Sequence, residues 1–486
     1  MDKEGINTYI YKKLEETPEL LKYELTTNNE PLEYRNSYFK IKKHVDDFLG
    51  GYIENRFITL AGLRGVGKTT ILLQIYDYLT NEKNINKNRV LYIPADEIED
   101  YIGSNLFEVI NTFIEEVHKT SPVSLEKELF ILIDEAQYDK NWSKTGKIIY
   151  DKTKKIFFIF TGSSALNFEM NVDAVRRIKK ESVFPLNFLE YNKLKNKIYP
   201  PEDYEKAFIN LILNGNETGE LNDDILEIMT KKENELRNKL IKKNNSLKKE
   251  YEKFLIQGTF PFGLKIKDFE IHRRIYNMIE RIIEKDIFSL KSFNTNTRST
   301  ISQIITYLAL QDPGGTSDIK LATILAKSKK SIREILNTLE KTHLIFSVKP
   351  FGGPGKQVRK PWKYFFLSPS INTSIRYRFG KYRKNDRKFL GLLAENYVAS
   401  FFFKIKETEN YYLNIYYDPS ENGVDFLLET IDNIIPVEVS IGKKDKKQIT
   451  KAINQYKSNY GIIISNTTER IKKKKNILYI PLVSVP

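Results

Sequence analysis

Residues 57–76 join an apolar run, a glycine-rich turn and a helical pattern, and no other part of the chain constrains its fold as strongly. Residues 57–61 have strand character, and residues 70–76 have helical spacing. Between them lies a complete phosphate-binding loop made of Gly62, Leu63, Arg64, Gly65, Val66, Gly67, Lys68 and Thr69. Glycines there let backbone N–H groups turn around a triphosphate, and the helix N-terminus adds partial positive charge. The order strand, loop, helix therefore predicts a nucleotide-binding α/β fold.

The side chains of this loop and of a later strand predict the chemistry. Lys68 should reach the β- and γ-phosphates, the Thr69 hydroxyl should bind Mg²⁺, and Thr70 extends the binding segment. Residues 129–133 form a fully apolar strand that ends in Asp134 and Glu135. Asp134 would hold Mg²⁺, and Glu135 would orient and deprotonate water. The sequence therefore predicts a hydrolase, with ATP as the favoured nucleotide.

A third apolar strand, residues 156–160, runs into Thr161, Gly162, Ser163 and Ser164. This turn resembles that of AAA-type ATPases, in which the strand after the acid pair carries a small polar sensor near the γ-phosphate, and either serine suits that position. The alternative is an ordinary turn. Arg176 and Arg177 follow, ahead of residues 184–191. An arginine here is a second candidate for contact with phosphate.

At this point the chain resembles the bacterial and archaeal AAA-type ATPases that carry a nuclease-like domain at the C-terminus. That family shows Asp-Glu-x-Gln after the second strand and a Thr-Gly-Ser-Ser turn, which residues 134–137 and 161–164 match. It also shows Gly-Arg followed eight residues later by Pro-Leu-Ser-Phe-x-Glu-Tyr. Here Arg177 takes the arginine position, while Arg176 and Asn187 replace the glycine and the serine. These departures leave open which arginine, if either, faces a phosphate, and whether it acts in cis or in trans within a homo-oligomer.

Length, charge and composition bound the rest. A chain of 486 residues should divide into about three domains, and the absence of cysteine excludes disulfides and thiolate metal sites. The net charge of +15 favours a polyanionic partner such as nucleic acid, although lysine excess also follows from codon bias. The N-terminus lacks a signal-peptide pattern, and no apolar run approaches the roughly 18 residues of a membrane span. We expect a cytoplasmic protein without a membrane partner.

The pattern along the chain predicts an α/β fold with a P-loop AAA-type parallel sheet core, a helical lid, a winged helix and a small α/β restriction-endonuclease-like domain. The predicted boundaries are an N-terminal helical arm at 1–34, the core at 35–191, the lid at 192–292, the winged helix at 293–375 and the nuclease-like domain at 376–486. Within the lid, residues 231–253 are expected to form one highly charged, exposed helix.

The winged-helix pattern consists of helices at 301–310, 319–326 and 331–343, followed by strands at 344–348 and 362–367. A basic third helix and a basic wing tip would suit DNA, and a module that only packs between domains is the alternative. The candidate DNA contacts are Lys329, Lys330, Arg333, Lys356, Arg359 and Lys360.

The last segment resembles PD-(D/E)xK nucleases, in which two carboxylates bind Mg²⁺ and a lysine positions water. Asp425 and Glu438 fall on adjacent strands, and Glu395 lies on the apolar stripe of a helix. However, residue 440 is serine where the motif requires lysine. The domain is therefore either an active nuclease with an altered site or a degenerate fold that binds DNA or only packs.

Three functions remain open after these observations. The first is an ATPase that acts on DNA through its C-terminal domains. The second is a nucleotide-gated signalling or defence switch whose C-terminal domains bind a protein partner. The third is a nuclease licensed by ATP.

Overall fold

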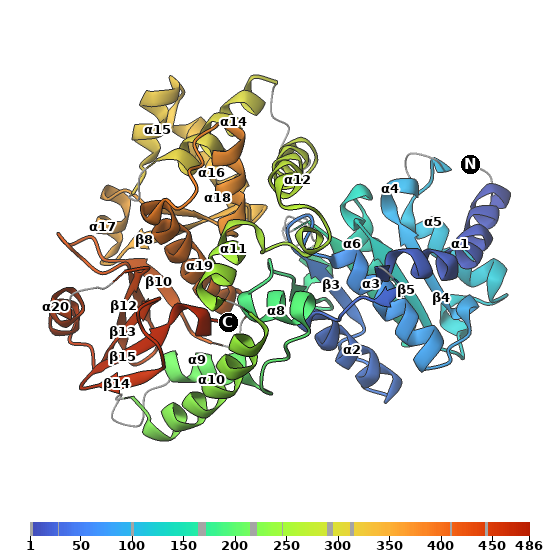
Figure 1. The fold of residues 1–486 in the computed structure, drawn as a ribbon. Helices are drawn as coiled ribbons and strands as arrows, with labels where there is room; N and C mark the ends of the chain where they lie inside the picture. Colours follow the sequence, from blue (N-terminus) through green and yellow to red (C-terminus); the bar gives the residue numbers. More distant parts are fainter. Residues whose placement is uncertain are drawn as a thin grey trace. The chain divides into compact units, whose positions relative to one another are not determined.

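The computed structural model describes residues 3–27, 29–98, 102–163, 172–213, 221–244, 246–288, 295–311, 315–408, 411–442 and 446–486. The chain divides into two compact units, which comprise Met1–Phe184 and Pro185–Pro486. We refer to them as unit 1 and unit 2. Unit 1 is drawn in blue to cyan in Figure 1, and unit 2 runs from green to red.

Unit 1 is built on a parallel sheet with the strand order β4-β5-β6-β3-β7. The strands are β3 Phe57–Ala61, β4 Val90–Pro94, β5 Leu129–Asp134, β6 Ile156–Gly162 and β7 Lys179–Ser182. Every residue of β3, β5 and β6 is buried, as their uninterrupted apolar runs predict for strands covered on both faces. The parallel α/β core predicted from the sequence is therefore confirmed.

Helices cover this sheet, as Figure 1 shows. They are α1 Lys3–Glu24, α2 Asn36–Leu49, α3 Lys68–Asp77, α4 Ala95–Glu97, α5 Leu106–Thr112, α6 Trp142–Lys152 and α7 Val172–Val175. A short hairpin, β1 Thr26–Thr27 and β2 Glu30–Pro31, follows α1. Ile6, Ile10 and Leu14 of α1 belong to the same apolar core as β5 and β6. The predicted N-terminal arm thus packs into unit 1.

The first half of unit 2 is helical. Its helices are α8 Phe188–Asn196, α9 Tyr204–Leu213, α10 Asp223–Lys243, α11 Leu247–Gln257 and α12 Asp268–Arg281. The single charged helix predicted at 231–253 is wrong, because α10 ends at Lys243 and Ser246 caps a new helix. The Ser246 side chain accepts a hydrogen bond from the Lys249 N–H, as serine commonly does at a helix start.

The second half of unit 2 contains an eight-stranded mixed sheet with the order β14-β15-β13-β12-β11-β10-β8-β9. The strands are β8 Ile345–Pro350, β9 Lys363–Phe366, β10 Asn414–Tyr417, β11 Phe426–Glu429, β12 Ile434–Ser440, β13 Gly461–Ser465, β14 Lys472–Lys474 and β15 Ile477–Pro481. β8 pairs with β10, so one sheet crosses the predicted boundary at 375/376.

The remaining helices are α14 Thr295–Leu310, α15 Asp318–Leu325, α16 Lys329–Lys341, α17 Pro354–Arg359, α18 Pro369–Arg378, α19 Arg387–Glu407 and α20 Lys446–Tyr456. α14, α15 and α16 precede the antiparallel pair β8 and β9, which is the order predicted for the winged-helix segment. The expected wing loop instead contains α17, which starts at Pro354, a favourable residue for the first turn of a helix.

Among the described residues, no helix combines the length and apolar character needed to cross a membrane.

Candidate functional site

The glycines of the loop between β3 and α3 have the geometry that a phosphate cradle requires. Gly65 and Gly67 have φ angles of 77° and 93°, in the left-handed region that glycine adopts without strain. A Cβ atom on Gly62 would lie 2.2 Å from the carbonyl oxygen of Val183. The loop therefore depends on glycine for its own conformation and for its contact with the backbone after β7.

Lys68 and Arg35 fasten this loop from inside. The Lys68 Nζ donates hydrogen bonds of 2.9 and 3.0 Å to the carbonyl oxygens of Gly62 and Leu63. The buried guanidinium of Arg35 donates to the carbonyl oxygen of Val66 and, at 2.9 Å, to that of Phe184. Arg35 thus links the phosphate loop to the last residue of unit 1. Its role was not predicted, since it lies about 30 residues before the motif in an otherwise ordinary polar segment.

The acid pair at the end of β5 lies beside the loop. The Thr69 Oγ1 donates a 2.8 Å hydrogen bond to Asp134 Oδ2, and the Thr161 hydroxyl donates to Asp134 Oδ1. The Thr161 oxygen also accepts from the backbone N–H of Glu135 at 3.2 Å. β5 and β6 are neighbours in the sheet, with Ile133 opposite Phe160, so Thr161 near the end of β6 lies level with Asp134 at the end of β5. Thr161 therefore holds both members of the acid pair.

Glu135 is placed by an unusual backbone conformation. Its φ and ψ angles are 51° and 46°, a left-handed conformation that is uncommon outside glycine and is enriched at active sites. Its Oε2 accepts from the Gln137 amide and lies 3.7 Å from the Arg64 guanidinium. Burial alone would raise the pKa of Glu135, but the charges of Lys68 and Arg64 outweigh burial and lower it. Glu135 is therefore held in its charged, proton-accepting form.

Asp134 is more deeply enclosed than Glu135. Burial, and then the charge of Glu135, raise the pKa of Asp134 above its usual value. A divalent cation here would relieve this repulsion. The Thr69 hydroxyl and one Asp134 oxygen are oxygen donors of the kind that Mg²⁺ prefers, with phosphate oxygens and water to complete its octahedron. The residues present therefore fit a magnesium nucleotide.

The other predicted residues of this site have different positions. Ser163 is buried, and its hydroxyl has no hydrogen-bond partner among the described residues. Ser164 lies outside the described residues. Arg177 forms a 2.5 Å ion pair with Asp151 of α6 and donates to the Asp173 carbonyl, whereas Arg176 is exposed. Neither arginine is bonded to the loop or the acid pair in the described structure.

Comparison with known proteins places this site in a family. A family model described as an AAA domain matches residues 54–192. An uncharacterized protein of Methanocaldococcus jannaschii is 33% identical over 482 residues, which cover 98% of this chain and 93% of that protein. The chain belongs to the family of that archaeal protein. An uncharacterized protein of Haemophilus influenzae is 23% identical over 83% of this chain and 87% of its own length.

This family thus combines an AAA-type P-loop ATPase fold with further C-terminal structure. Two models, each described as a domain of unknown function, match residues 248–379 and 390–485. Among solved structures, Aeropyrum pernix Orc1 in complex with DNA has a TM-score of 0.32 and 9% identity, over 73% of this chain and 96% of that one. Aquifex aeolicus DnaA bound to AMPPCP has a TM-score of 0.25 and 14% identity, over 64% and 89%.

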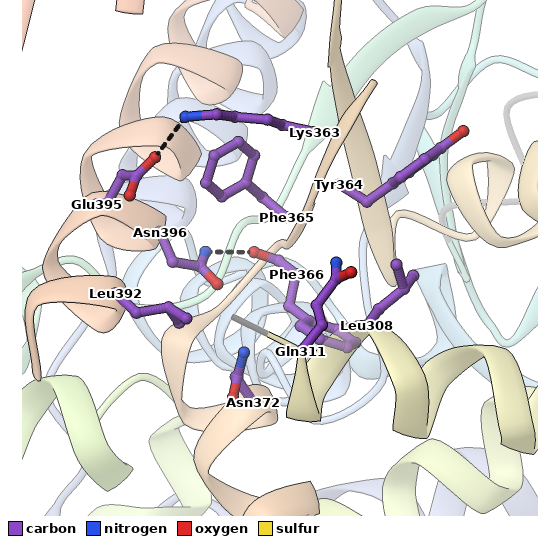
Figure 2. Close-up of a pocket in the computed structure, with 10 residues that line it drawn as sticks. All are labelled: Leu308, Gln311, Lys363, Tyr364, Phe365, Phe366, Asn372, Leu392, Glu395 and Asn396. Atoms are coloured by element: carbon purple, nitrogen blue, oxygen red, sulfur yellow. Dashed lines mark hydrogen bonds and ion pairs between the residues drawn. The ribbon is translucent and has the colours of Figure 1, made fainter. Parts of the chain in front are cut away.

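In this family member, the C-terminal carboxylates are neighbours and share a lysine that the sequence did not predict. The Lys363 Nζ of β9 lies 3.2 Å from Glu395 Oε1 of α19, at the edge of the pocket in Figure 2. Asp425 Oδ2 accepts a 2.8 Å hydrogen bond from the Val439 N–H, next to buried Glu438. Burial, followed by the charges of Glu395 and Glu438, raises the pKa of Asp425 well above its usual value.

The lysine brings the positive charge that Ser440 lacks. Burial alone would lower the pKa of Lys363, but the charges of Glu395 and Asp425 outweigh it and raise the value. The Ser440 Oγ instead bonds Gly442. No group of three or more His, Cys, Asp or Glu side chains in the described parts of the chain is arranged to hold a metal ion. Lys363 was missed because β9 is distant in sequence from the nuclease-like motif.

Five of the six candidate DNA contacts are exposed, and the sixth is engaged in an ion pair. Lys329 and Lys330 are exposed at the start of α16, and Lys356, Arg359 and Lys360 are exposed on and after α17. Arg333, by contrast, forms a 2.5 Å ion pair with the buried Asp318, and its guanidinium lies 4.5 Å from the Trp362 ring centroid. A contact from Arg333 to DNA would therefore have to break an ion pair that joins α15 to α16.

Proposed function

We propose that unit 1 binds ATP with Mg²⁺ and hydrolyses it. The observation that carries this proposal is the contact between the Thr69 hydroxyl and Asp134, beside a loop in which Gly65 and Gly67 have the left-handed backbone conformation of a phosphate-binding turn. Mg²⁺ held by Thr69 and Asp134 would supply positive charge to the β- and γ-phosphates. The Lys68 ammonium, which now bonds two loop carbonyls, would turn to the same phosphates.

Glu135 is the proposed general base. Its backbone conformation and the nearby Arg64 hold the carboxylate beside the loop, and the proton of the attacking water would pass to a Glu135 oxygen. Thr161 is a positioning residue, because its hydroxyl bonds Asp134 and the Glu135 N–H but no reacting atom. Ser163, Ser164 and an arginine acting in cis or in trans remain proposals for the γ-phosphate.

The test compares wild type with Lys68→Ala, using an exposed lysine of unit 1, Lys127→Ala, as the matched control. Magnesium-dependent ATP binding and phosphate release are measured on the same samples. We expect Lys68→Ala to lose saturable ATP binding and Lys127→Ala to keep both activities. Absence of magnesium-dependent binding in the wild type, or an unchanged Lys68→Ala variant, would refute the proposal.

We further propose that the nucleotide state is coupled to unit 2 through Arg35. This side chain contacts the Val66 carbonyl in the phosphate loop and the Phe184 carbonyl at the end of unit 1. A change of loop conformation on hydrolysis would therefore reach the point where the chain enters unit 2. An Arg35→Lys variant should hydrolyse ATP while responding less to any ligand of unit 2.

DNA is the partner we propose for unit 2, supported by the exposed Lys329, Lys330, Lys356, Arg359 and Lys360. Hydrolysis stimulated by DNA, with a steep dependence on salt, would support this function. Salt-insensitive hydrolysis without retention on DNA would support the nucleotide-gated switch that binds a protein. Cleavage of DNA lost in both Glu438→Ala and Lys68→Ala would support the licensed nuclease.

A further inference from the structure

The chain between α18 and α19 is unusually basic and aromatic. Residues 376–388 contain seven lysines or arginines and one acid, Asp386, interspersed with Tyr377, Phe379 and Tyr382. The segment begins at the end of one matched domain model, at residue 379, and extends to just before the next, at residue 390. Neither the phosphate site nor the predicted winged-helix contacts include it. It therefore needs an explanation of its own.

The backbone turns sharply here and leaves large side chains exposed. Gly380 has a φ of 66°, and the N–H groups of Gly380 and Lys381 bond the carbonyls of Tyr377 and Arg376 at 3.2 and 2.8 Å. This ends α18 in a left-handed turn that glycine favours. The side chains of Tyr377 and Phe379 are 48% and 46% exposed. Two large rings are thus presented at the tip of a well-ordered turn.

Helix α12 extends this surface with further arginines. It packs against α18, and both helices are labelled in Figure 1. Arg273 and Arg274 of α12 are exposed, and the Arg378 guanidinium lies 5.4 Å from the centroid of the Tyr276 ring. We call Arg273, Arg274 and residues 377–388 together the turn surface.

The Tyr377 ring packs against two neighbouring rings, those of His272 and Tyr382. It stacks on the imidazole of His272, with ring centroids 4.8 Å apart and an interplanar angle of 27°. His272 is buried and its Nδ1 lies 3.1 Å from the Ser374 Oγ, while Tyr382 packs 6.2 Å from Tyr377. Because the ring is already ordered, little conformational entropy would be lost when a flat ligand stacks on its exposed side.

Positive charge on the turn surface is largely uncompensated. Within the described structure, Arg273, Arg274, Lys381, Arg383, Lys384 and Arg387 form no ion pairs. Asp386 caps α19 by accepting from the Phe389 N–H at 3.0 Å. The acids of α12 are partly neutralised, since Asp268 pairs with Lys253 at 3.0 Å and Glu280 with Arg298 at 3.5 Å. Glu270 is the remaining acid in the first turn of α12.

We propose that the turn surface binds single-stranded nucleic acid. Lysine and arginine side chains would follow the phosphates, and bases would stack on Tyr377 and Phe379. Stacking of this kind needs unpaired bases, because the faces of the bases in a duplex are already covered by their neighbours. The combination of exposed rings and clustered cations therefore favours a single strand over duplex DNA.

The experiment measures binding of fluorescent single-stranded and duplex oligonucleotides to the full chain by anisotropy, without nucleotide. The aromatic variant is Phe379→Ala, alone and with Tyr377→Ala. The charge variant is Arg383→Glu/Lys384→Glu. Matched controls are Tyr23→Ala, a ring 80% exposed on α1, and Lys474→Glu/Lys475→Glu, two exposed lysines that give the same change in net charge.

We expect Phe379→Ala to weaken the affinity for the single strand about tenfold and to change the affinity for the duplex less than about twofold. The charge variant should weaken single-strand binding at least about tenfold, and both controls should stay within about twofold. The inference is overturned if the wild type binds no single strand or binds duplex at least as tightly. Equal losses in the two charge variants, or an unchanged Phe379→Ala, would also overturn it. Within the described part of the chain Phe379 stacks on no other ring, so the Phe379→Ala variant tests binding even if Tyr377→Ala perturbs the fold.

This inference is independent of the proposed hydrolysis. Lys68→Ala should keep single-strand binding at the turn surface, and variants of the turn surface should keep basal ATP hydrolysis. If only ATP binding fails, the inference about the turn surface is unaffected. If only oligonucleotide binding fails, the proposed ATPase function is unaffected.

Discussion

The two units each contain a buried group of acids next to a lysine, and they solve the problem of charge in different ways. In unit 1, Asp134 and Glu135 face a loop with room for phosphate, and Lys68 rests on backbone carbonyls. In unit 2, the Lys363 ammonium is itself paired with Glu395 beside Asp425. The proposed ligands of unit 1, Mg²⁺ and phosphate, would bring charges from outside the chain. In unit 2, the negative charge of the acids is balanced by Lys363 of the chain itself. Similar residue types therefore lie beside the P-loop in one unit and are paired with each other in the other.

The largest effect should come from the proposed base. Glu135→Gln removes a proton acceptor but keeps the size and shape of the side chain. General base catalysis contributes roughly 10²–10⁴-fold, so phosphate release should fall at least about 100-fold while ATP binding persists. Glu126→Gln, an exposed acid of the same unit, serves as the control. An unchanged rate in Glu135→Gln would mean that the acid pair of unit 1 has only a structural role, as the acids of unit 2 do.

Removal of the internal cation should damage unit 2. Lys363→Met leaves Glu395 and Asp425 without their positive neighbour. Breaking a fully buried pair typically costs about 3–5 kcal/mol, which is the upper limit for this half-buried pair. Denaturant unfolding should show this loss, and Lys406→Met on the exposed face of α19 should not. The double variant Lys363→Met/Glu395→Gln should recover part of it. A Lys363→Met protein as stable as wild type would contradict the balanced cluster.

Acid should weaken unit 2 through His272. Burial lowers the pKa of His272 to about 4, below its usual 6.5. As pH falls from about 6.5 toward 4, His272 binds a proton in the unfolded chain but stays neutral in the folded chain. The free energy of unfolding therefore decreases over that pH range. By pH 5 this single group should account for about 2 kcal/mol. Melting temperatures at pH 7 and pH 5 should therefore differ less in His272→Phe than in wild type.

The smallest predicted effect concerns Thr161 in unit 1. Thr161→Ala deprives Asp134 of one donor and the Glu135 N–H of its acceptor, which should cost about 1–2 kcal/mol, or about tenfold in hydrolysis. Thr161→Ser keeps the hydroxyl and should retain most of the rate. Equal rates in the serine and alanine variants would remove the positioning role.

The nucleotide site could be predicted because its chemistry is local. Gly62 to Thr69 are contiguous, and Asp134 follows a strand whose burial its own composition reveals. The contribution of Thr161 required the register of two strands, and a polar residue closing the apolar run of β6 is the signal that points to it. Arg35 and Lys363 act across the fold on distant partners, and no local pattern marks them.

Elsewhere, local patterns were incomplete guides. The order of α14, α15, α16, β8 and β9 could be predicted from periodicity, but the pairing of Arg333 with Asp318 depends on how α15 and α16 pack. The charge of residues 231–253 concealed a helix break that Ser246 caps. From the sequence, residues 376–388 are only the start of a domain. Their aromatic side chains form a surface together with α12, which supplies the His272 ring under Tyr377 and two exposed arginines.

The pairing of β8 with β10 has a practical consequence for dissecting this protein. The contact is short, with Tyr416 opposite Lys349 and Tyr417 opposite Pro350, yet it closes a single sheet. A truncation after residue 375 would separate β8 from β10. Each would then become an edge strand with unpaired backbone groups, and exposed edges of this kind promote aggregation. Fragments should therefore not be cut between β8 and β10. Because α11 and α12 also pack against α18, unit 2 has to be expressed as one piece.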